Sequence, residues 1–279
     1  MSHLFRISFL LHFAYRQYMN QVVSILGCGW LGKALGRVLA SSGYRVIGST
    51  TKRENMGYLQ AAGITPFVFE VSELLPENFD RQFFNTDVLV ISLPHGVRRG
   101  KSQEYVDQIN WVTQAANHAH TKHIILMSTT SVYPNLDRIV TEEDADPQNP
   151  IVKAEAIVLE SGIPGTVLRF AGLYGPGRDP GRFLAGRRDV KGANAPVNMI
   201  HMDDCVGIIK NVIENNQWNK VLNACADEHP TKKVFYSNAA LALGLDPPLF
   251  SDEPKTEYKI VSNERLKDTL NYRFYHQPI

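Results

Sequence analysis

A glycine pattern near the N-terminus constrains this chain more than any other feature. Residues 27–32 read Gly-Cys-Gly-Trp-Leu-Gly and directly follow an apolar run at 22–26 that predicts a buried strand. In such a pattern one glycine permits a tight turn, the next lets backbone approach a pyrophosphate, and the last lets the helix pack closely on the strand. The helix N-terminus adds N–H groups and a positive dipole end. The pattern predicts a dinucleotide site, and a ligand-free glycine turn is the alternative.

Short β-branched runs alternate with helical periods along the rest of the chain, which is typical of a parallel sheet covered by helices on both faces. The fold class is therefore α/β, with a doubly wound parallel sheet. The first helix has an apolar stripe from Leu31 to Leu39 and a C-terminal cap at Gly43. Further helices are predicted at 101–120, 152–161 and 203–214, and the tail after 226 is expected to be helical but mixed. The predicted strands are 22–26, 45–48, 66–71, 88–93, 123–128, 166–170 and 221–225.

The composition excludes several classes of protein. The chain has 279 residues, and 29 Lys and Arg against 28 Asp and Glu leave a net charge of +1. No basic stripe is present to neutralise phosphates or hold a membrane surface, so we expect neither nucleic acid nor membrane as a partner. Three cysteines without CxxC or metal-ligand spacing favour a reducing cytoplasm and no metal. A small-molecule substrate is the expected partner, with a homodimer as a candidate assembly.

Residues 1–18 differ from the sequence that follows them. The apolar stretch from Ser8 to Tyr15 is interrupted by His12 and is shorter than the about 20 residues that span a bilayer. No small-residue cleavage site follows it, as a secretory signal would need. We expect residues 1–18 to be a leader outside the fold, which begins near Met19. An amphipathic arm or a weak targeting signal is the alternative.

The end of the second strand predicts the choice of cofactor. A site that selects NAD carries an acid here against the ribose 2′-hydroxyl, but this chain has Ser49 and Thr50 instead. Lys52 and Arg53 follow, and a cation can hold a 2′-phosphate through hydrogen bonds worth about 1.5–3 kcal/mol each. NADP(H) is therefore favoured over NAD(H). The alternative is that the two cations form a solvated helix start.

Four ordered motifs resemble the extended short-chain dehydrogenases/reductases, the NAD(P)-dependent epimerase/dehydratase family. They are the glycine pattern, the strand end at 128–133, the stretch 168–178 and the segment 200–204. Within this family the GWLG, GRDPGRF and C-terminal segments look most like the YeeZ-like proteins. The resemblance implies a Rossmann domain at 19–171 and 198–225, and a small mixed substrate domain at 172–197 and 226–279. The implied cofactor contacts are Gly27, Gly29, Trp30, Leu31, Gly32, Ser49, Thr50, Lys52, Arg53, Leu93, Pro94 and Phe170.

The catalytic motif of the family is incomplete in this chain. Thr129 matches the family's Ser/Thr that polarises the substrate oxygen, but Ile151 and Glu155 stand where its Tyr and Lys are expected. Lys153 does not replace the lysine, because two helical residues rotate a side chain by roughly 200°. Tyr133 is a candidate proton donor, with packing under its loop as the alternative. His95, in the loop after the fourth strand, is a second acid/base candidate or a plain loop histidine.

Several other charged residues were weighed as site candidates. Arg178 and Arg182, with two more arginines at 187 and 188, follow the sixth strand, where an arginine fork can bind phosphate or carboxylate. The functional interpretation is an anionic or nucleotide-sugar substrate, and surface solvation is the alternative. The acidic run at 142–144 is expected to be a solvated face. His201, Asp203 and Asp204 are interpreted as a strand end and a helix cap.

Two classes of function remain from the sequence. One is an NADP(H)-dependent enzyme of the epimerase, dehydratase or reductase type, an oxidoreductase or isomerase in which Thr129 holds the reacting oxygen. The other is an NADP(H)-binding sensor or interaction protein without redox chemistry. The persisting substrate-side motifs favour the enzyme, and the missing Tyr/Lys pair favours the sensor.

Overall fold

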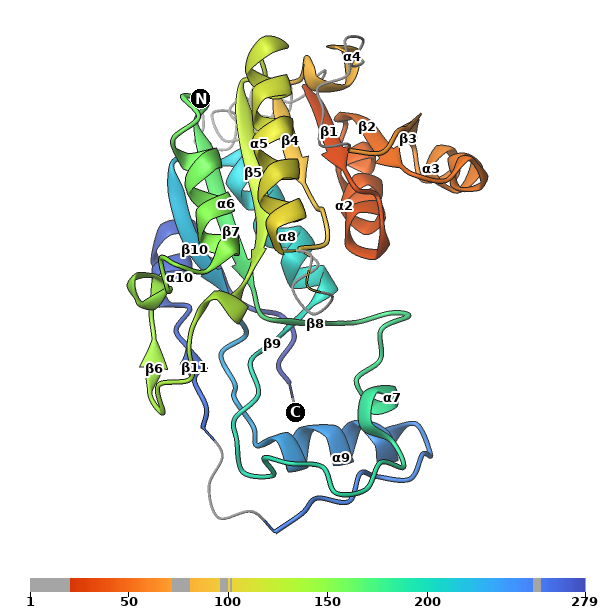
Figure 1. Ribbon diagram of the computed structural model, residues 1–279. Coiled ribbons are helices and arrows are strands. Elements are labelled where there is room, and N and C mark those ends of the chain that lie inside the picture. The colour runs from red at the N-terminus through yellow and green to blue at the C-terminus, as the bar shows by residue number, and fades with distance from the viewer. Residues whose placement is uncertain (1–20, 72–80, 96–99, 101, 253–256, 279) are drawn as a thin grey trace, which may run out of the picture. The chain divides into compact units, whose positions relative to one another are not determined.

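A seven-stranded parallel sheet forms the centre of the protein. The computed structural model describes residues 21–71, 81–95, 100, 102–252 and 257–278, so the expected leader at 1–18 lies outside the described residues. The strand order is β10-β7-β5-β4-β1-β2-β3 (Figure 1). The strands are β1 (Val22–Leu26), β2 (Arg45–Thr50), β3 (Ile64–Val68), β4 (Val88–Ile91), β5 (His123–Thr129), β7 (Gly165–Phe170) and β10 (Lys220–Ala224).

This sheet confirms the predicted fold class. All seven predicted strands are present, and most of their bounds agree to within two residues. β3 was placed too late, because Gly63 at φ +77° makes the turn that brings the chain into the strand at Ile64. The apolar runs identified these strands because buried parallel strands read as nearly continuous hydrophobic segments.

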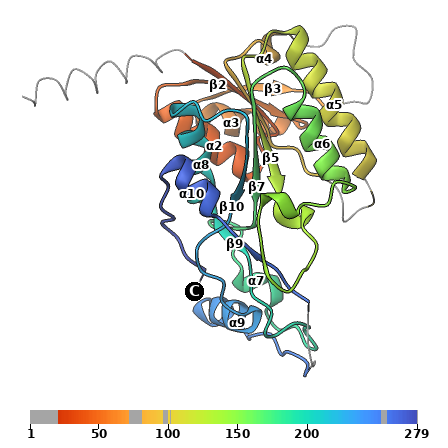
Figure 2. The ribbon, with the colours of Figure 1, turned by 90° about the vertical axis from the view of Figure 1, so that its left-hand side faces the viewer.

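The order of the strands places a ligand site at β1. The chain runs from β1 outward to β2 and β3 and then returns to β4 on the other side of β1. α2 (Trp30–Ser41) and α5 (Ser102–His118) consequently cover opposite faces of these strands (Figure 2). Connections that leave two neighbouring strands in opposite directions open a crevice at the carboxyl ends, where ligands of doubly wound sheets bind. The crevice is expected at the ends of β1 and β4.

The sequence of α2 explains why this helix packs on β1. Leu31, Leu35 and Leu39 are buried on one face, whereas Lys33 and Arg37 are exposed on the other. Gly43 follows the helix at φ +93°, in the left-handed region that favours glycine. The predicted stripe and cap are both confirmed.

The chain divides into two compact units. One comprises the described residues up to Leu126 together with 157–165, and the other comprises 127–156 and 166–279. This division passes through β5 and differs from the domain bounds implied by the resemblance, which stay a prediction.

The first unit is built around the glycine turn. Its core contains Val23, Ile25 and Val90 from the strands. An aromatic group of the same core consists of Phe83, Phe84 and Trp111. Besides α2 and α5 it contains the short elements η1 (Arg53–Asn55), α3 (Met56–Ala61) and α4 (Arg81–Phe84).

The second unit adds two small sheets that the sequence did not predict. β8 (Gly172–Tyr174) pairs with β9 (Met199–His201), and β6 (Ile139–Val140) pairs with β11 (Ile260–Val261). Strands this short carry too few residues for a period to be visible. The remaining elements of the chain are η3 (Thr130–Val132), η4 (Glu142–Asp144), α6 (Pro150–Leu159), α7 (Gly181–Leu184), α8 (Met202–Glu214), α9 (Lys232–Ala242) and α10 (Glu264–Leu270). Among the described helices none is both long and apolar enough to span a membrane.

Candidate cofactor site and the polar networks of the second unit

Two of the three glycines in the turn after β1 are closely packed. Gly27 has φ +97°, and a Cβ there would lie 2.6 Å from the Ser92 carbonyl oxygen. A Cβ on Gly32 would lie 2.4 Å from the Gly27 carbonyl oxygen, so only glycine lets α2 approach the turn this closely. A Cβ on Gly29, in contrast, would meet no atom within 4 Å. The middle glycine is therefore the one that leaves room beside the backbone, as binding of a pyrophosphate requires.

The N-terminus of α2 is suited to an anion. Its N-cap is Gly29, which has no side chain to cap the helix, and the first turn contains no acidic residue. The first N–H groups of a helix have no partner within the helix and carry a positive partial charge. An anionic diphosphate at this end would accept these hydrogen bonds. Trp30 and Leu31, two predicted contacts, form the beginning of this first turn.

Ser49 and Thr50 are placed differently from each other at the end of β2. Ser49 is buried, and its hydroxyl accepts a hydrogen bond from the Gly27 N–H at 2.8 Å. The Cys28 N–H bonds the Ser49 carbonyl at 2.9 Å, so this serine positions the glycine turn. Thr50 Oγ1 accepts from the Lys52 N–H at 3.2 Å and shapes the turn after the strand.

The two predicted 2′-phosphate ligands lie on the surface at the end of β2. Lys52 and Arg53 are both exposed, and Lys52 Nζ lies 3.6 Å from Glu54 Oε1, which is also exposed. An ion pair between exposed side chains is worth about 0–1 kcal/mol, so Glu54 competes only weakly with a phosphate for this lysine. No acidic side chain stands at the position that would select NAD.

The loop after β4 approaches the glycine turn. The Ser92 N–H donates to the Leu26 carbonyl at 2.8 Å, and Leu93 Cδ2 would lie 3.8 Å from a Cβ on Gly27. Leu93 is half-buried and Pro94 is exposed, and their contact with a cofactor stays a prediction. The ring of the half-buried His95 stands edge-on to Tyr105, with ring centroids 6.3 Å apart.

In the second unit, Thr129 is the last residue of β5. Its Oγ1 accepts a hydrogen bond from the Ser131 N–H at 3.2 Å as the cap of η3. This contact uses an acceptor site and leaves the hydroxyl proton available to a substrate oxygen. Phe170, the last residue of β7 and a predicted cofactor contact, is buried.

Tyr133 is placed in the core of the second unit. Its hydroxyl donates to Asn223 Oδ1 at 2.5 Å and accepts from Arg169 Nη1 at 2.8 Å. Burial, the largest influence, raises the pKa of Tyr133 to about 12, although the neighbouring Arg169 acts in the opposite direction. These contacts favour the packing role, which was the alternative weighed from the sequence, and proton donation stays a prediction.

The positions of the family's Tyr and Lys are both occupied by buried side chains. Ile151 is 1% exposed, and Glu155 is 2% exposed. The Glu155 carboxylate accepts from Arg169 Nη2 at 2.6 Å and from the Ser128 hydroxyl at 2.5 Å. Neither side chain reaches solvent, so this helix face supplies no acid or base to a ligand.

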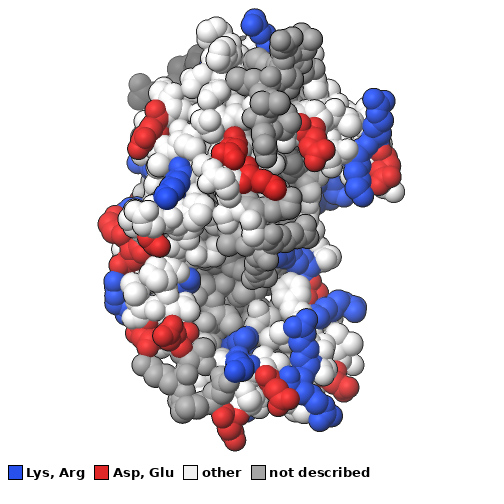
Figure 3. Space-filling view, in the orientation of Figure 1, with Lys and Arg blue, Asp and Glu red and all other residues white. Residues whose placement is uncertain are grey.

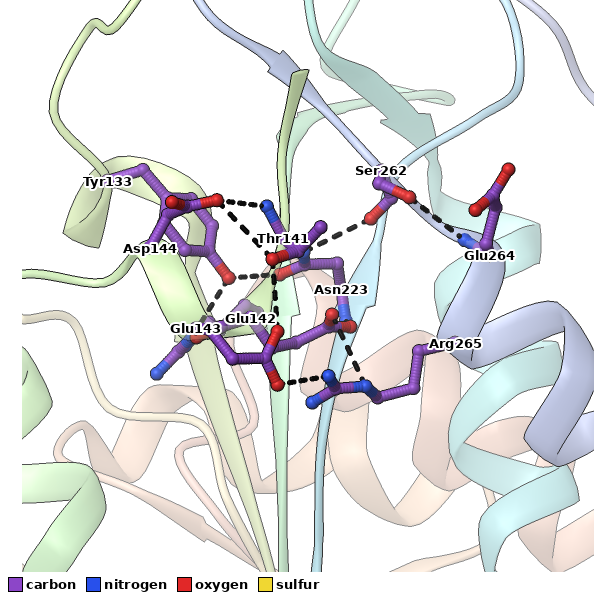
Figure 4. A network of polar contacts seen from close by, with 10 residues as sticks. Tyr133, Thr141, Glu142, Glu143, Asp144, Asn223, Ser262, Glu264 and Arg265 are labelled. Carbon is purple, nitrogen blue, oxygen red and sulfur yellow. Dashed lines mark hydrogen bonds and ion pairs between the residues drawn. The ribbon is translucent and has the colours of Figure 1, made fainter. Parts of the chain in front are cut away.

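The acidic run at 142–144 is only partly a solvated face, which corrects the sequence interpretation. Glu142 is buried and accepts a hydrogen bond from the Asn223 N–H at 2.8 Å (Figure 4). Arg265 Nε lies 3.5 Å from Glu142, and the same guanidinium pairs with Glu143. Two of the three acidic residues, Glu142 and Glu143, thus bind Arg265 of α10. Sequence gives no sign of this pairing across more than 120 positions.

The predicted substrate arginines are exposed. Arg178 takes part in an isolated bridge with Gly175, and Arg182 lies in α7. Lys and Arg side chains gather on the surface over the region of α7 (Figure 3). The structure thus provides a cationic surface but brings no carboxylate into an ion pair with Arg182 among the described residues. Binding of an anion there stays a prediction.

Asp204 anchors the C-terminal segment, a role that the sequence did not reveal. This fully buried carboxylate accepts from the Tyr272 hydroxyl at 3.1 Å and the Tyr275 N–H at 2.9 Å. The His276 N–H and His276 Nδ1 lie 3.1 and 3.2 Å from its other oxygen. Asp204 is therefore more than the helix-cap residue expected from its position.

His201, Asp203 and His276 present three ligand atoms within 4.8 Å of one another. The two imidazole rings are stacked, with centroids 3.9 Å apart and planes at 24°. A metal ion lies in the plane of each imidazole that binds it, and these two planes do not meet within bonding distance of the rings. His201 Nδ1 also accepts the Asp203 N–H at 3.2 Å. We therefore assign no metal to this cluster.

The comparison with known proteins identifies the family. Residues 27–204 match the sequence profile of the NAD(P)H-binding family. The chain belongs to this family. Protein YeeZ of Escherichia coli K12 is 33% identical over 270 residues, which cover 92% of this chain and 97% of YeeZ. The predicted NAD(P)-binding domain and the likeness to the YeeZ-like proteins are thereby confirmed, and NAD(P)(H) is the cofactor class.

Solved structures share the fold over most of its length. A conserved protein of unknown function from Silicibacter pomeroyi DSS aligns with TM-score 0.72 and 26% identity, covering 93% of this chain and 95% of that one. UDP-glucuronic acid 4-epimerase from Bacillus cereus, in complex with NAD, aligns with TM-score 0.73 and 19% identity, covering 92% and 94%. At this identity the second likeness concerns the fold alone.

Proposed function

We propose that this protein is an NADP(H)-dependent oxidoreductase of the epimerase, dehydratase or reductase type that acts on a small anionic substrate. The observation that carries the proposal is the glycine turn, where Gly29 leaves open space beside an uncapped helix N-terminus. When bound, the cofactor supplies or accepts a hydride. Thr129 would donate its hydroxyl proton to the carbonyl or carbinol oxygen of the substrate, since its other hydrogen bond uses a lone pair.

Preference for NADP(H) rests on the end of β2. The Ser49 hydroxyl bonds the glycine turn, and β2 ends without an acidic residue. The exposed Lys52 and Arg53 follow this strand. An acid at this point would accept the ribose 2′-hydroxyl and repel a 2′-phosphate, whereas a cation attracts the phosphate. Arg178 and Arg182, both exposed, would bind the anionic part of the substrate. Because UDP-glucuronic acid 4-epimerase shares this fold, nucleotide sugars are the first substrates to test.

Fluorescence titration with NADPH and NADH tests the cofactor assignment. Wild type is expected to bind NADPH more tightly, and Lys52→Ala/Arg53→Ala should reduce this preference by about tenfold or more, because each charge-assisted hydrogen bond is worth about 1.5–3 kcal/mol. Lys33→Ala removes an exposed lysine from α2 and serves as the control. Equal binding of the two cofactors by wild type, or an unchanged ratio in the double variant, would refute the preference.

A second candidate function is an NADP(H)-binding sensor or interaction protein without turnover. The observation in its favour is that Ile151 and Glu155 are buried and that Glu155 is bound to Arg169. General acid–base help contributes typically about 10²- to 10⁴-fold to a rate, so its loss weakens catalysis strongly. An assay of NADPH oxidation and NADP reduction with UDP-sugars and simple carbonyl compounds distinguishes the enzyme from the sensor. Tight NADPH binding without turnover on any of them favours the sensor.

A further inference from the structure

Lys259 is a half-buried lysine without an acidic partner among the described residues. It lies immediately before β11, and its Nζ donates to the Tyr133 carbonyl oxygen at 2.5 Å. Two other lysines of the same unit pair with carboxylates: Lys210 with Glu214 at 2.6 Å and Lys267 with Asp227 at 2.9 Å. Lys259 makes no ion pair with any residue that the structure describes.

The fold brings this lysine to the carboxyl ends of β5 and β7. Asn198 Nδ2 donates to the Lys259 carbonyl at 2.9 Å, and Asn198 Oδ1 accepts from the Val261 N–H at 2.8 Å. The carbonyl of Asn198 accepts the N–H of Gly172 at 3.0 Å, two residues after the end of β7. The ammonium itself reaches the loop that follows Thr129 at the end of β5. Ligands of doubly wound sheets bind at this edge.

A cation in this position favours an anionic ligand. Partial burial lowers the pKa of Lys259, because the charged form loses hydration and no carboxylate of the described residues compensates for this loss. The Tyr133 carbonyl uses one of three ammonium protons, which leaves donors for a second group. A carboxylate or phosphate oxygen would supply both the missing charge and the missing hydrogen bonds.

We propose that Lys259 binds an anionic group of the small-molecule substrate, a carboxylate or a phosphate, at the carboxyl ends of β5 and β7, other than the group that Arg178 and Arg182 would bind. The assignment to a substrate rests on the proposed function, whereas the anion site itself does not. It places a charge near the loop that begins at Thr129, and it is separate from the exposed arginines at 178 and 182. A purely structural lysine would tie the Tyr133 loop down and need no anion.

Thermal unfolding of the full chain with added anions tests the site, with ionic strength held constant by sodium chloride. Inorganic phosphate, acetate and UDP are the probes, and a ligand that binds only the folded protein raises its melting temperature. We expect at least one probe to stabilise wild type. Lys259→Gln should weaken that probe by about tenfold, and Lys259→Arg should retain most of its effect, since arginine keeps the charge. Lys153→Gln, which removes an exposed lysine, should behave as wild type.

Acetylation of wild type with an amine-reactive ester gives a second measurement that needs no variant to fold. Mass spectrometry should show Lys259 protected by the same probe that raises the melting temperature. Protection by acetate and phosphate alike indicates a general anion site, and stronger protection by UDP indicates a nucleotide. Absence of protection by all three probes, or an unchanged probe affinity in Lys259→Gln, overturns the proposal.

The NADPH titration keeps this test distinct from that of the proposed function. Lys259→Gln should bind NADPH as wild type does, because the glycine turn is intact. If wild type fails to bind NADPH while the anion still protects Lys259, the proposed function is wrong and the anion site stands. If NADPH binds but no anion protects Lys259, the anion site is wrong and the cofactor assignment stands.

Discussion

The carboxylate of Glu155 accepts two hydrogen bonds from Arg169, from Nε at 3.1 Å and from Nη2 at 2.6 Å. Both side chains are at most 5% exposed, and Arg169 Nη1 also reaches the Glu142 carbonyl oxygen at 2.8 Å. Glu155 stands where the family's catalytic lysine is expected. The position is therefore part of a buried network that joins β5, β7 and α6.

Replacing Glu155 should cost stability and spare cofactor binding. Glu155→Gln leaves the Arg169 guanidinium buried without its counter-charge, and breaking a buried ion pair in this way typically costs about 3–5 kcal/mol. We expect a loss of this size in urea unfolding and an unchanged NADPH affinity. Glu160→Gln, at an exposed position just after α6, should have little effect. A Glu155→Gln protein as stable as wild type would show that the pair contributes no net stability.

Gly29 and Gly32 should respond differently to alanine. Gly29 has φ −75° and open space at its Cβ, so Gly29→Ala should keep the melting temperature. The new methyl group would occupy the space beside the helix N-terminus, and we expect NADPH affinity to fall about 10- to 100-fold through lost charge-assisted hydrogen bonds. Gly32→Ala places its Cβ 2.4 Å from a backbone oxygen, and should also lower stability by about 1–3 kcal/mol.

Gly57→Ala is the matched control for this pair. Gly57 lies in α3, and a Cβ there meets nothing within 4 Å. Alanine in a helix interior is favoured over glycine by about 1 kcal/mol, so this variant should be as stable as wild type or more stable, with the same NADPH affinity. If Gly29→Ala binds NADPH as wild type does, the pyrophosphate does not lie beside the middle glycine.

The central sheet and the glycine turn were accessible from the sequence because they depend on local signals. Apolar runs mark the strands, and the spacing of Gly27, Gly29 and Gly32 marks the turn. The polar networks were not accessible, because their partners are distant in the chain. Lys259 and Tyr133 are separated by 126 positions, and Asn223 and Glu142 by 81. The sequence around one residue of such a pair does not indicate which distant residue is its partner.

The same limit explains the interpretation of single residues. Glu142 reads as one of three acids on a surface, yet the fold directs it to a buried N–H of β10 and to Arg265. Tyr133 reads as a hydroxyl in a loop near Thr129, yet the fold turns it toward Arg169. Residue type predicts which bonds a side chain can make, and only the tertiary structure determines whether solvent or a ligand can reach it.

Thr129 should affect turnover and not cofactor binding. Thr129→Val removes the hydroxyl that would donate to the substrate oxygen, and we expect any turnover found to fall by roughly tenfold or more. NADPH affinity, measured by fluorescence, should change little, because Thr129 is not part of the glycine turn that would bind the cofactor. Thr129→Ser keeps the hydroxyl and its contact with the Ser131 N–H, so it should retain most of the turnover. Unchanged turnover in Thr129→Val would remove this hydroxyl from the mechanism.

Acidification should destabilise the protein through His201. Burial, followed in size by the neighbouring His276, holds the pKa of His201 below its ordinary value of 6.5. Well above pH 6.5 the imidazole is neutral in both the folded and the unfolded chain, so His201 adds no pH dependence there. As the pH falls below 6.5, the unfolded chain binds this proton first, and the stability of the folded protein decreases until the folded-state pKa is passed.

Thermal unfolding between about pH 4.5 and about pH 8, which lie on either side of the ordinary histidine pKa, measures this effect. His201→Asn removes the titrating group, and its amide oxygen can still cap α8 as the His201 nitrogen does for the Asp203 N–H. The variant should lose less stability than wild type on acidification, with the difference confined to pH values below 6.5. His118→Asn changes an exposed histidine at the end of α5 and should retain the wild-type slope. Equal slopes in wild type and His201→Asn would mean that the buried ring of His201 takes up its proton as readily in the folded chain as in the unfolded one.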